Sequence, residues 1–255
     1  MRKWRFLDTG PRTAIDNIAL DYALLRGLES HSRCTFRLRE FSSPAVTVGY
    51  NQTVDEAVNR EFCKRSRIQI ARRLTGGGAI YVDEHCLGWE IVASARFMKA
   101  FSSNVDLFDI AAKPIVKAMA MVGLPAKFRQ KNDIEVRGKK ISGMAAARIK
   151  NYLIIQGTLL VAIDPRSMSG ALKRDSTKPR HKARSITARV TSLEKELGRP
   201  FDLHSVKSLL KKSFETNFQV RLIEKKLSAK EIDFFHYYRK FFGSNDWSLK
   251  VDHDL

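Results

Sequence analysis

The 255-residue chain has few acidic residues, few cysteines and no long apolar run. Its cysteines, Cys34, Cys63 and Cys86, are odd in number and lack metal-ligand spacing, which argues against a disulfide framework or a cysteine metal site. The longest apolar stretch, Leu153 to Ile163, is interrupted by Gln156 and is too short to cross a bilayer. The opening MRKWRFLDTG also lacks the apolar segment of a signal peptide. We therefore expect a reduced, cytoplasmic protein that is not in the membrane.

Acidic residues are scarce relative to basic ones, with 27 Asp plus Glu against 46 Lys plus Arg, for a net charge of +19. Such a charge attracts polyanions, and nucleic acid, acidic proteins and nucleotide phosphates all answer that description. The densest basic segment is Lys173 to Arg189, which contains a single acid, Asp175, and one proline, Pro179. We expect this segment to be a disordered loop in the absence of a ligand.

Helical spacing of apolar residues and helix caps predict four main helices. The first is an amphipathic helix that begins at Thr13. The second runs from about Val105 to Val122, with Gly123 as its C-terminal cap and Pro114 causing a kink or a late start. The others run from Asp202 to Phe214 and from Ser228, where Glu231 completes a capping box.

Short β-like runs separated by turn residues predict a sheet built largely of neighbours in sequence. These runs are Cys34 to Leu38, Ala45 to Val48, Ile68 to Arg72, Ala79 to Val82, Leu87 to Ala93, Ile134 to Val136, Lys140 to Ala147 and Tyr152 to Ile163. Strands followed by segregated helices favour an α+β fold. We expect one domain over residues 1–255, with a helical C-terminal part at about 200–255 and no fused accessory domain.

Three consecutive glycines stand between two of the predicted strands, in the sequence ARRLTGGGAI at 71–80. Glycines let backbone amides approach a ligand closely, and the Thr75 hydroxyl can donate a hydrogen bond to a carboxylate or phosphate. A flexible hairpin turn is the simpler alternative. A third glycine, together with Arg72 and Arg73, favours a ligand loop. It is neither a Walker loop nor a GxGxxG fingerprint, because the required endings are missing.

A second motif is NDIEVRGKKISGMAAARI at 132–149. Arg137 and Gly138 predict a hairpin turn that places Lys139 and Lys140 on a returning strand, where only one of them can face inward. A pair of surface charges is the ordinary alternative. The small and apolar residues that follow make an unpaired cation costly, so we expect the inward lysine to meet an anion, such as a nucleotide phosphate or a substrate carboxylate.

Several segments in one order resemble those of lipoate–protein ligases in the biotin/lipoate ligase superfamily. They are WRFLDTG, VTVGYNQ, ARRLTGGGAIYVD, NDIEVRGKKISGMAAARI, QGTLLV, SITARVTSL and SNDWSLK. The resemblance spans nearly the whole chain. It implies a fold like that of class II aminoacyl-tRNA synthetases and biotin synthetases, with a large, mixed, mainly antiparallel sheet, a smaller sheet and flanking helices.

The resemblance also implies a reaction in two steps. The lipoate carboxylate first attacks the α-phosphate of ATP to give lipoyl-AMP, with Mg²⁺ on the nucleotide. A lysine of an acceptor domain, such as that of a 2-oxoacid dehydrogenase or the glycine cleavage H protein, then takes the lipoyl group. The apolar tail needs an apolar tunnel, for which Val46, Val48, Ile80 and Leu159 are candidates, and the basic loop is expected to close over the adenylate.

Site residues carry over from the resemblance motif by motif. Lys140 is the catalytic residue. The lipoate-binding set is Arg72, Arg73, Thr75, Gly76, Gly77 and Gly78. The nucleotide-binding set is Gly78, Ala79, Asp83, Asn132, Asp133, Lys140, Ser142 and Gly143, with Asp133 as the Mg²⁺ ligand.

Departures from the family pattern keep alternatives open. Val82 and Gln156 stand where a histidine is common, and Ala126-Lys127-Phe128 stands where related acyltransferases carry a nucleophilic cysteine. We favour the ligase over a cofactor-independent octanoyl or lipoyl transferase, with Cys86 interpreted as a packing residue. A nucleic-acid-binding protein on this fold is the alternative from another class. Biotin is disfavoured as the acyl group, because RRLTGGG differs from the GRGRxG pattern.

A resemblance to bipartite archaeal-type ligases adds one expectation. Enzymes of this family commonly need a small accessory domain for adenylation, and we expect this chain either to receive it as a separate subunit or to be poor at activation alone. The aromatic run FFHYYRKFF at 234–242 is interpreted as core, with docking as the alternative.

Overall fold

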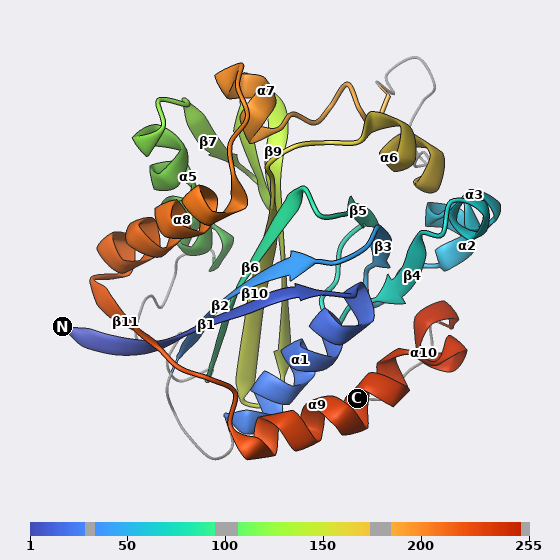
Figure 1. The fold of residues 1–255 in the computed structure, drawn as a ribbon, viewed down its shortest axis with the longest axis horizontal. Coiled ribbons are helices and arrows are strands. Elements are labelled where there is room, and N and C mark those ends of the chain that lie inside the picture. Colours follow the sequence, from blue (N-terminus) through green and yellow to red (C-terminus); the bar gives the residue numbers. More distant parts are fainter. Residues whose placement is uncertain (29–33, 95–106, 174–184, 251–255) are drawn as a thin grey trace.

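The computed structural model describes residues 1–28, 34–94, 107–173 and 185–250 (Figure 1). The described residues form one large mixed sheet, a small second sheet and helices on both sides. In spatial order the strands of the large sheet are β11 (Val220–Glu224), β1 (Arg2–Arg12), β2 (Thr35–Phe41), β6 (Cys86–Ser94), β10 (Tyr152–Leu160), β9 (Lys139–Ile149), β8 (Asp133–Val136) and β7 (Ala126–Arg129). Strand β1 runs parallel to β2 and β11, and the other pairs are antiparallel. This confirms the expected α+β fold class.

The small sheet has the order β4-β3-β5, with β4 (Gln69–Arg72) parallel and β5 (Ile80–Val82) antiparallel to the central β3 (Ala45–Val48). The helices are α1 (Ala14–Gly27), α2 (Val54–Ala57), α3 (Arg60–Arg65), α5 (Leu107–Met121), α6 (Pro165–Ala171), α7 (Leu193–Leu197), α8 (Leu203–Phe218), α9 (Ala229–Phe242) and α10 (Asn245–Leu249). Among the described residues, none of these helices combines the length and the hydropathy needed to cross a bilayer.

Local capping signals fix several helix ends. The Thr13 side chain accepts a hydrogen bond from the Asp16 amide at the start of α1, and Ser228 and Glu231 form the expected capping box of α9. Gly123 follows α5 with φ of +81°, a conformation that glycine adopts without strain. Pro114 lies inside α5. The cap residues confirm the helix ends that local chemistry predicts, whereas the kink at Pro114 stays a prediction.

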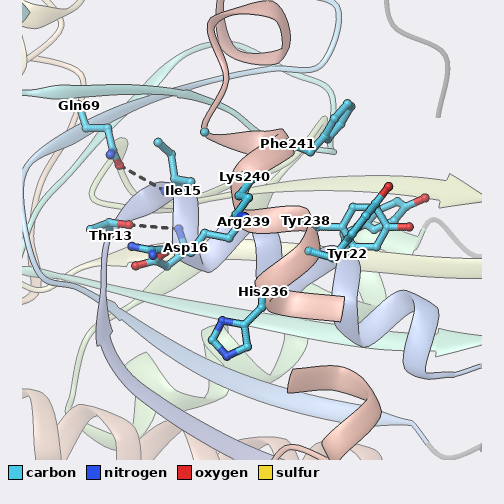
Figure 2. A pocket seen from close by; sticks show the side chains of 12 residues that line it. Thr13, Ile15, Asp16, Tyr22, Gln69, His236, Tyr238, Arg239, Lys240 and Phe241 are labelled. Atoms are coloured by element: carbon cyan, nitrogen blue, oxygen red, sulfur yellow. Dashed lines mark hydrogen bonds and ion pairs between the residues drawn. The ribbon is translucent and has the colours of Figure 1, made fainter. Parts of the chain in front are cut away.

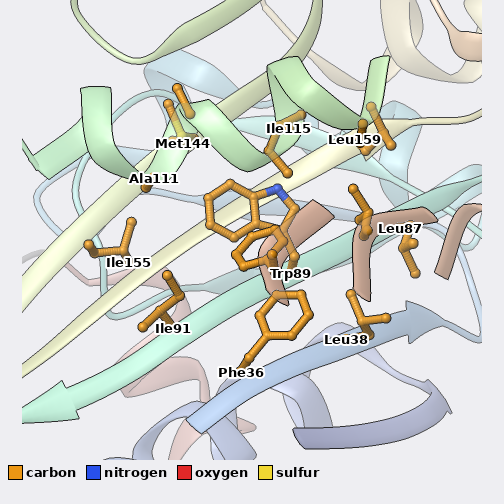
Figure 3. Close-up of a cluster of buried hydrophobic side chains, with 14 of the residues drawn as sticks. Phe36, Leu38, Leu87, Trp89, Ile91, Ala111, Ile115, Met144, Ile155 and Leu159 are labelled. Carbon is orange, nitrogen blue, oxygen red and sulfur yellow. The ribbon is translucent and has the colours of Figure 1, made fainter. Parts of the chain in front are cut away.

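One face of the large sheet packs against α5 and α8 around Trp89 (Figure 3). The Trp89 indole is fully buried, with Ile115 of α5 on one side and Phe36 of β2 on the other. Gly157 on the neighbouring strand makes this possible, because a Cβ there would lie 2.6 Å from the indole ring. The glycine of QGTLLV is therefore a packing requirement of the core.

The other face is covered by α1, and α9 packs outside α1 (Figure 1). Helix α1 packs on the core as predicted, and its polar residues Asn17 and Asp21 are buried as well, so the helix is covered nearly all round. The helices meet at Gly27, which leaves room for the side chain of Glu231. Glu231 forms a salt bridge of 2.6 Å with Arg5 of β1.

Two expectations about topology are wrong. The short runs in the first half of the chain do not form one sheet of sequence neighbours, because β3, β4 and β5 separate into the small sheet. The C-terminal part is not purely helical, because β11 pairs with β1 at the edge of the large sheet. Strand β1 lies between β2 and β11 in the large sheet. Its pairing with β11 joins the two ends of the chain's sequence.

Candidate active site

The glycine loop, Gly76 to Gly78, lies between β4 and β5, and the Arg73 side chain binds its carbonyl groups. Its guanidinium donates to the carbonyl oxygens of Gly76 at 2.7 Å and Gly78 at 2.8 Å. Within the described residues, no acceptor meets the backbone N–H groups of Gly76, Gly77 or Gly78. Arg73 thus hydrogen-bonds to the carbonyl groups of the loop. The amides of the loop remain as donors for an anion or a polarised carbonyl.

The loop is also pressed against the end of β3. A Cβ on Gly49 would overlap the carbonyl oxygen of Gly77, and Gly77 itself has φ of +92°. The Tyr50 amide donates to the Thr75 carbonyl at 3.0 Å, which adds a second tie between the two segments. Gly49, in the VTVGYNQ segment, is therefore required by this close approach.

Arg72 points away from the glycine loop. Its fully buried guanidinium donates to the carbonyl oxygens of Gly49, Tyr50 and Gln52, and its Nε donates to that of Trp247 at 3.1 Å. Adjacent strand residues face opposite sides of a sheet, so Arg72 and Arg73 cannot share one pocket. The structure contradicts the expectation that Arg72 lines the lipoate site, and Arg72 instead ties α10 to the small sheet.

Lys140 lies on β9, just after the predicted hairpin turn. Arg137 and Gly138 both have positive φ, 50° and 75°, as a two-residue type I′ turn requires. A β-bulge follows, because Glu135 pairs with Lys140 while Ile134 pairs with Ser142. Bulges re-aim side chains next to active sites, and this one puts Lys140 on the same face as Gly143.

The backbone of Lys140 is fixed from a third side by the SITARVTSL segment. Its amide donates to the Arg189 carbonyl at 2.9 Å, and its carbonyl accepts from the Thr191 amide at 2.8 Å. The side chain lies across Gly143, where a Cβ would overlap the ammonium. The glycine after Ser142 is thus the space that the lysine occupies.

The Lys140 ammonium lies 2.6 Å from the Asp133 carboxylate, and about a third of each side chain is exposed. Asp133 is thus the anionic partner of this lysine in the protein itself, and the expected phosphate or carboxylate of a ligand stays a prediction. The inward lysine is not buried, because 31% of its side chain is accessible. An accessible ion pair at a cavity wall can exchange its partner for a substrate anion at modest cost.

Two adjoining cavities meet at this ion pair. The inner one has a volume of about 230 Å³ and lies between α1, the glycine loop and the large sheet. The outer one, of about 670 Å³, is bordered by β8, β9 and α6. Both cavities are lined by Ala79, Ile80, Asn132, Asp133, Lys140, Gly143 and Thr158.

The predicted site residues divide between those at the cavities and those behind them. Arg73, Gly77 and Gly78 line the inner cavity. Thr75 and Ser142 are fully buried and line neither cavity, and Gly76 also lies outside both linings. The sequence could not place them, because the burial of a strand or loop residue depends on what packs over it.

Asp83 is not in either cavity lining. It is buried in the turn between β5 and β6, where its carboxylate accepts from the His85 amide at 3.0 Å. Burial raises the pKa of Asp83 above its ordinary value. The structure therefore assigns Asp83 to a turn, contrary to the expected nucleotide contact.

Of the tunnel candidates, only Ile80 lines the cavities. Val46 and Val48 lie in the small-sheet core and Leu159 in the main core. The inner cavity is instead lined by residues that the sequence did not single out, including Ile18, Arg39 and Thr158, together with Gln156. Of these residues, Gln156 alone gave a signal in the sequence, because it stands where a histidine is common in the family. Residues 174–184 of the basic segment lie outside the described residues, although Ile186 and Arg189 after them border the outer cavity.

All three cysteines lie in the described part of the chain, and each is buried. None lines the inner or the outer cavity. Burial raises the pKa of each thiol, for Cys34 and Cys86 most strongly. A thiol in such surroundings is a weak nucleophile, because the reactive form is the thiolate.

A third hollow, of about 1280 Å³, lies on the outside of α1 and α9 (Figure 2). Two of its charged residues, Asp16 and Arg239, pair with each other. Tyr237 and Phe241 of α9 are exposed, at 72% and 43%, whereas Phe242 is buried against Trp247. Only part of the aromatic run is core, so the all-core interpretation is wrong for this helix.

Few side chains at the two cavities could bind a metal cation. The described residues contain no group of three or more His, Cys, Asp or Glu side chains placed to hold a metal ion. Asp133 is the one carboxylate shared by both cavities. Mg²⁺ on a nucleotide typically needs one or two carboxylates besides the phosphates, and this set fits that requirement.

Comparison with known proteins gives one family match and several relatives. A model of the lipoyl protein ligase A/B catalytic domain matches residues 13–215. Lipoate–protein ligase 1 of Staphylococcus aureus is 29% identical over 198 residues, which cover 77% of this chain and 58% of that protein. Octanoyltransferase LipM of Oceanobacillus iheyensis is 28% identical over 239 residues, 86% of this chain and 87% of the relative. The chain thus matches less than two thirds of the first relative's length.

Solved structures show the same fold. The chain superposes with a TM-score of 0.86 and 24% identity on a bi-partite lipoate protein ligase from Thermoplasma acidophilum, covering 100% of this chain and 99% of that one. It superposes with a TM-score of 0.83 and 24% identity on a lipoate-protein ligase A bound with ATP, covering 99% and 100% of the two chains.

Proposed function

We propose an ATP-dependent lipoate–protein ligase activity for this chain, which belongs to the family of lipoyl protein ligase A/B catalytic domains. The observation that carries the proposal is the meeting of the two cavities at Lys140. In the proposed arrangement the acyl chain occupies the inner cavity and the nucleotide the outer one. The reacting carboxylate and the α-phosphate then meet beside the ammonium.

In the first step, a carboxylate oxygen of lipoate bonds to the α-phosphorus of ATP and the bond to the β-phosphate oxygen breaks. Pyrophosphate leaves and lipoyl-AMP remains. Two anions must approach each other, so an ammonium placed between them lowers the barrier electrostatically. Lys140 holds this position, and Asp133 keeps its side chain over Gly143 before substrates enter.

In the second step, the neutral amine of an acceptor lysine attacks the carbonyl carbon of lipoyl-AMP. AMP leaves with the bonding electrons, the amine loses a proton to water, and an amide remains. The developing charge on the carbonyl oxygen is stabilised by the amides of Gly77 and Gly78, which Arg73 holds in place from the other side. Mg²⁺ bound by Asp133 would neutralise phosphate charge.

Acyl transfer through a cysteine is the competing function, because several relatives are octanoyltransferases. That route needs a reactive thiol at the acyl site. The three cysteines of this chain are buried away from both cavities. Their placement supports the ligase.

One incubation separates the two functions. An acceptor domain is treated with the chain, Mg²⁺ and a mixture of lipoate, octanoate and biotin, with or without ATP, and is weighed by mass spectrometry. We expect a lipoyl mass gain only when ATP is present. A parallel incubation without ATP contains an octanoyl thioester donor in place of the free acids, and a mass gain there would reject the ligase in favour of the transferase.

We further propose lipoyl acceptor domains and a separate accessory subunit as partners. The fold match to a ligase described as bi-partite supports the second partner, as do the exposed aromatic residues of α9. The chain alone should then transfer the lipoyl group from synthetic lipoyl-AMP more efficiently than from ATP plus lipoate. Equal turnover from both substrates, with no other protein present, would reject the accessory subunit.

A further inference from the structure

The floor of the inner cavity is a row of residues across four strands of the large sheet. Arg39 pairs with Gly88, Gly88 with Thr158, and Thr158 with Gly143. Cations lie over both glycines, because the Lys140 side chain crosses Gly143 and the Arg39 side chain crosses Gly88, where a Cβ would lie 2.6 Å from Nε. Since adjacent strands are 4.7–4.9 Å apart, the two glycines are separated by roughly 10 Å.

Arg39 is held in this position by buried acids. Its guanidinium lies 3.0 Å from Asp21 and 3.6 Å from Glu90, and both carboxylates also contact Arg37. Asp21 comes from α1, so the helix that roofs the cavity also fixes its far cation. The Arg39 side chain is only 8% exposed. Its place at the cavity wall is therefore built by the fold.

Two polar groups of residues that line the cavity have no partner in the described part of the chain. Arg39 Nε and Gln156 Oε1 are buried and meet no hydrogen-bonding group among the described residues. The other end of the Gln156 amide donates to the Thr75 hydroxyl at 2.6 Å. A hydroxyl both donates and accepts, so the amide can turn over and offer the cavity either a donor or an acceptor. Both side chains line the inner cavity.

A plain alkyl chain in this cavity would leave both polar groups buried and unsatisfied, which costs binding free energy. A chain that ends in sulfur or oxygen atoms would accept a hydrogen bond from Arg39. Its end could also form a hydrogen bond with the Gln156 amide. Resting on the function proposed above, we propose that the inner cavity selects carboxylic acids whose far end carries hydrogen-bonding sulfur or oxygen atoms. Arg39 and Gln156 are the specificity-determining residues, and lipoate is preferred to octanoate.

Calorimetric binding without ATP tests this selection separately from catalysis. The full chain is titrated with lipoate, octanoate and ω-hydroxyoctanoate. We expect the first and third to bind at least about tenfold more tightly than octanoate, since one hydrogen bond to a buried polar group is worth about that factor. Transfer to an acceptor domain with ATP should follow the same order in kcat/KM.

Three variants assign the selection to the named groups. Arg39→Met and Gln156→Met replace the polar groups with apolar ones and should bring the lipoate-to-octanoate ratio close to one. Arg39→Lys removes Nε but keeps a cation for Asp21, so it should lose selectivity with less loss of stability. Arg5→Met, a change at a buried arginine paired with Glu231 far along the sheet, is the control and should keep the wild-type ratio.

The outcomes are distinguishable. Equal binding of lipoate and octanoate by the wild-type chain would overturn the selection while leaving the ligase function standing, and so would variants that weaken both acids alike. Binding of none of the three acids, with no acyl transfer under any condition, would instead reject the proposed function itself. Thermal unfolding of each variant, measured alongside, shows whether a lost ratio comes from a lost fold.

Discussion

Lys140 Nζ lies 2.6 Å from Asp133 Oδ1, at the boundary between the inner and outer cavities. The pair keeps a cation aimed at the place where the proposed reaction occurs, before either substrate has bound. Binding of a nucleotide then offers both residues new partners, because phosphate attracts the ammonium and a phosphate-bound cation attracts the carboxylate.

Asp133→Asn should raise the KM for ATP by about tenfold, the loss expected for one charge-assisted interaction. Lipoate binding measured without ATP should change much less, because the carboxylate serves the nucleotide. Steady-state kinetics at varied ATP and fixed Mg²⁺ provide the measurement. Asp109→Asn makes the same chemical change in a surface ion pair with Lys113 and serves as the control. If both variants behave like the wild type, Asp133 has no role in nucleotide binding.

Gly49→Ala should destabilise the fold and weaken acyl binding. The added methyl group overlaps the Gly77 carbonyl, so the glycine loop has to move away from β3. Overpacking of this kind costs about 1–3 kcal/mol. Urea unfolding gives the loss, and calorimetry gives the change in lipoate affinity. Gly76→Ala, whose methyl group would meet no atom within 4 Å, should keep the wild-type free energy of unfolding. Equal stability losses in the two variants would contradict the proposed contact.

The helix ends could be predicted from the sequence alone, whereas the surroundings of the glycine loop could not. Thr13 and Ser228 cap their helices through bonds to residues three positions away, so the capping chemistry is readable locally. The shared cavity of Gly77 and Lys140 was expected only because several motifs together resemble a known family. Neither motif alone specifies which strands lie side by side.

Other features depend on contacts that no local pattern records. Arg39 reaches the inner cavity because Gly88, about fifty positions later in the chain, lies opposite it on β6. Ser142 was expected at the nucleotide, yet it is fully buried and lines neither cavity. Strand β11 was missed because its short apolar pattern lies between two helices. In each case tertiary packing decides what the residue does.

Glu90 should make the stability pH-dependent. Burial and the nearby Asp21 raise the pKa of Glu90 from 4.5 to about 7, although Arg37 and Arg39 oppose the shift. The folded state therefore holds a proton that the unfolded state has already released, so this contribution to stability is full below pH 4.5 and is lost as the pH rises to about 7. Glu90→Gln cannot titrate. The wild-type free energy of unfolding minus that of the variant should fall across this window, and a difference that stays constant or rises would contradict the assignment.

The cysteines provide a test of mechanism. In the folded protein, iodoacetamide should modify Cys34, Cys63 and Cys86 slowly, because each thiol is buried and its pKa is raised. A variant with all three changed to alanine should keep ATP-dependent lipoyl transfer, provided that circular dichroism shows it folded. Complete loss of transfer in a folded, lipoate-binding variant would indicate a thiol nucleophile.

The proposed role of Lys140 is tested by measuring lipoyl-AMP formation by the wild-type chain and by Lys140→Ala. Each is supplied with lipoate, ATP labelled on the α-phosphate, Mg²⁺ and any accessory subunit identified. We expect labelled lipoyl-AMP and pyrophosphate from the wild type, and a drop of at least about a hundredfold without the ammonium, as for other preorganised electrostatic groups. Calorimetry should show that the variant still binds lipoate. Lipoyl-AMP formation at the wild-type rate by Lys140→Ala would contradict the claim that this residue joins the two cavities into one active site.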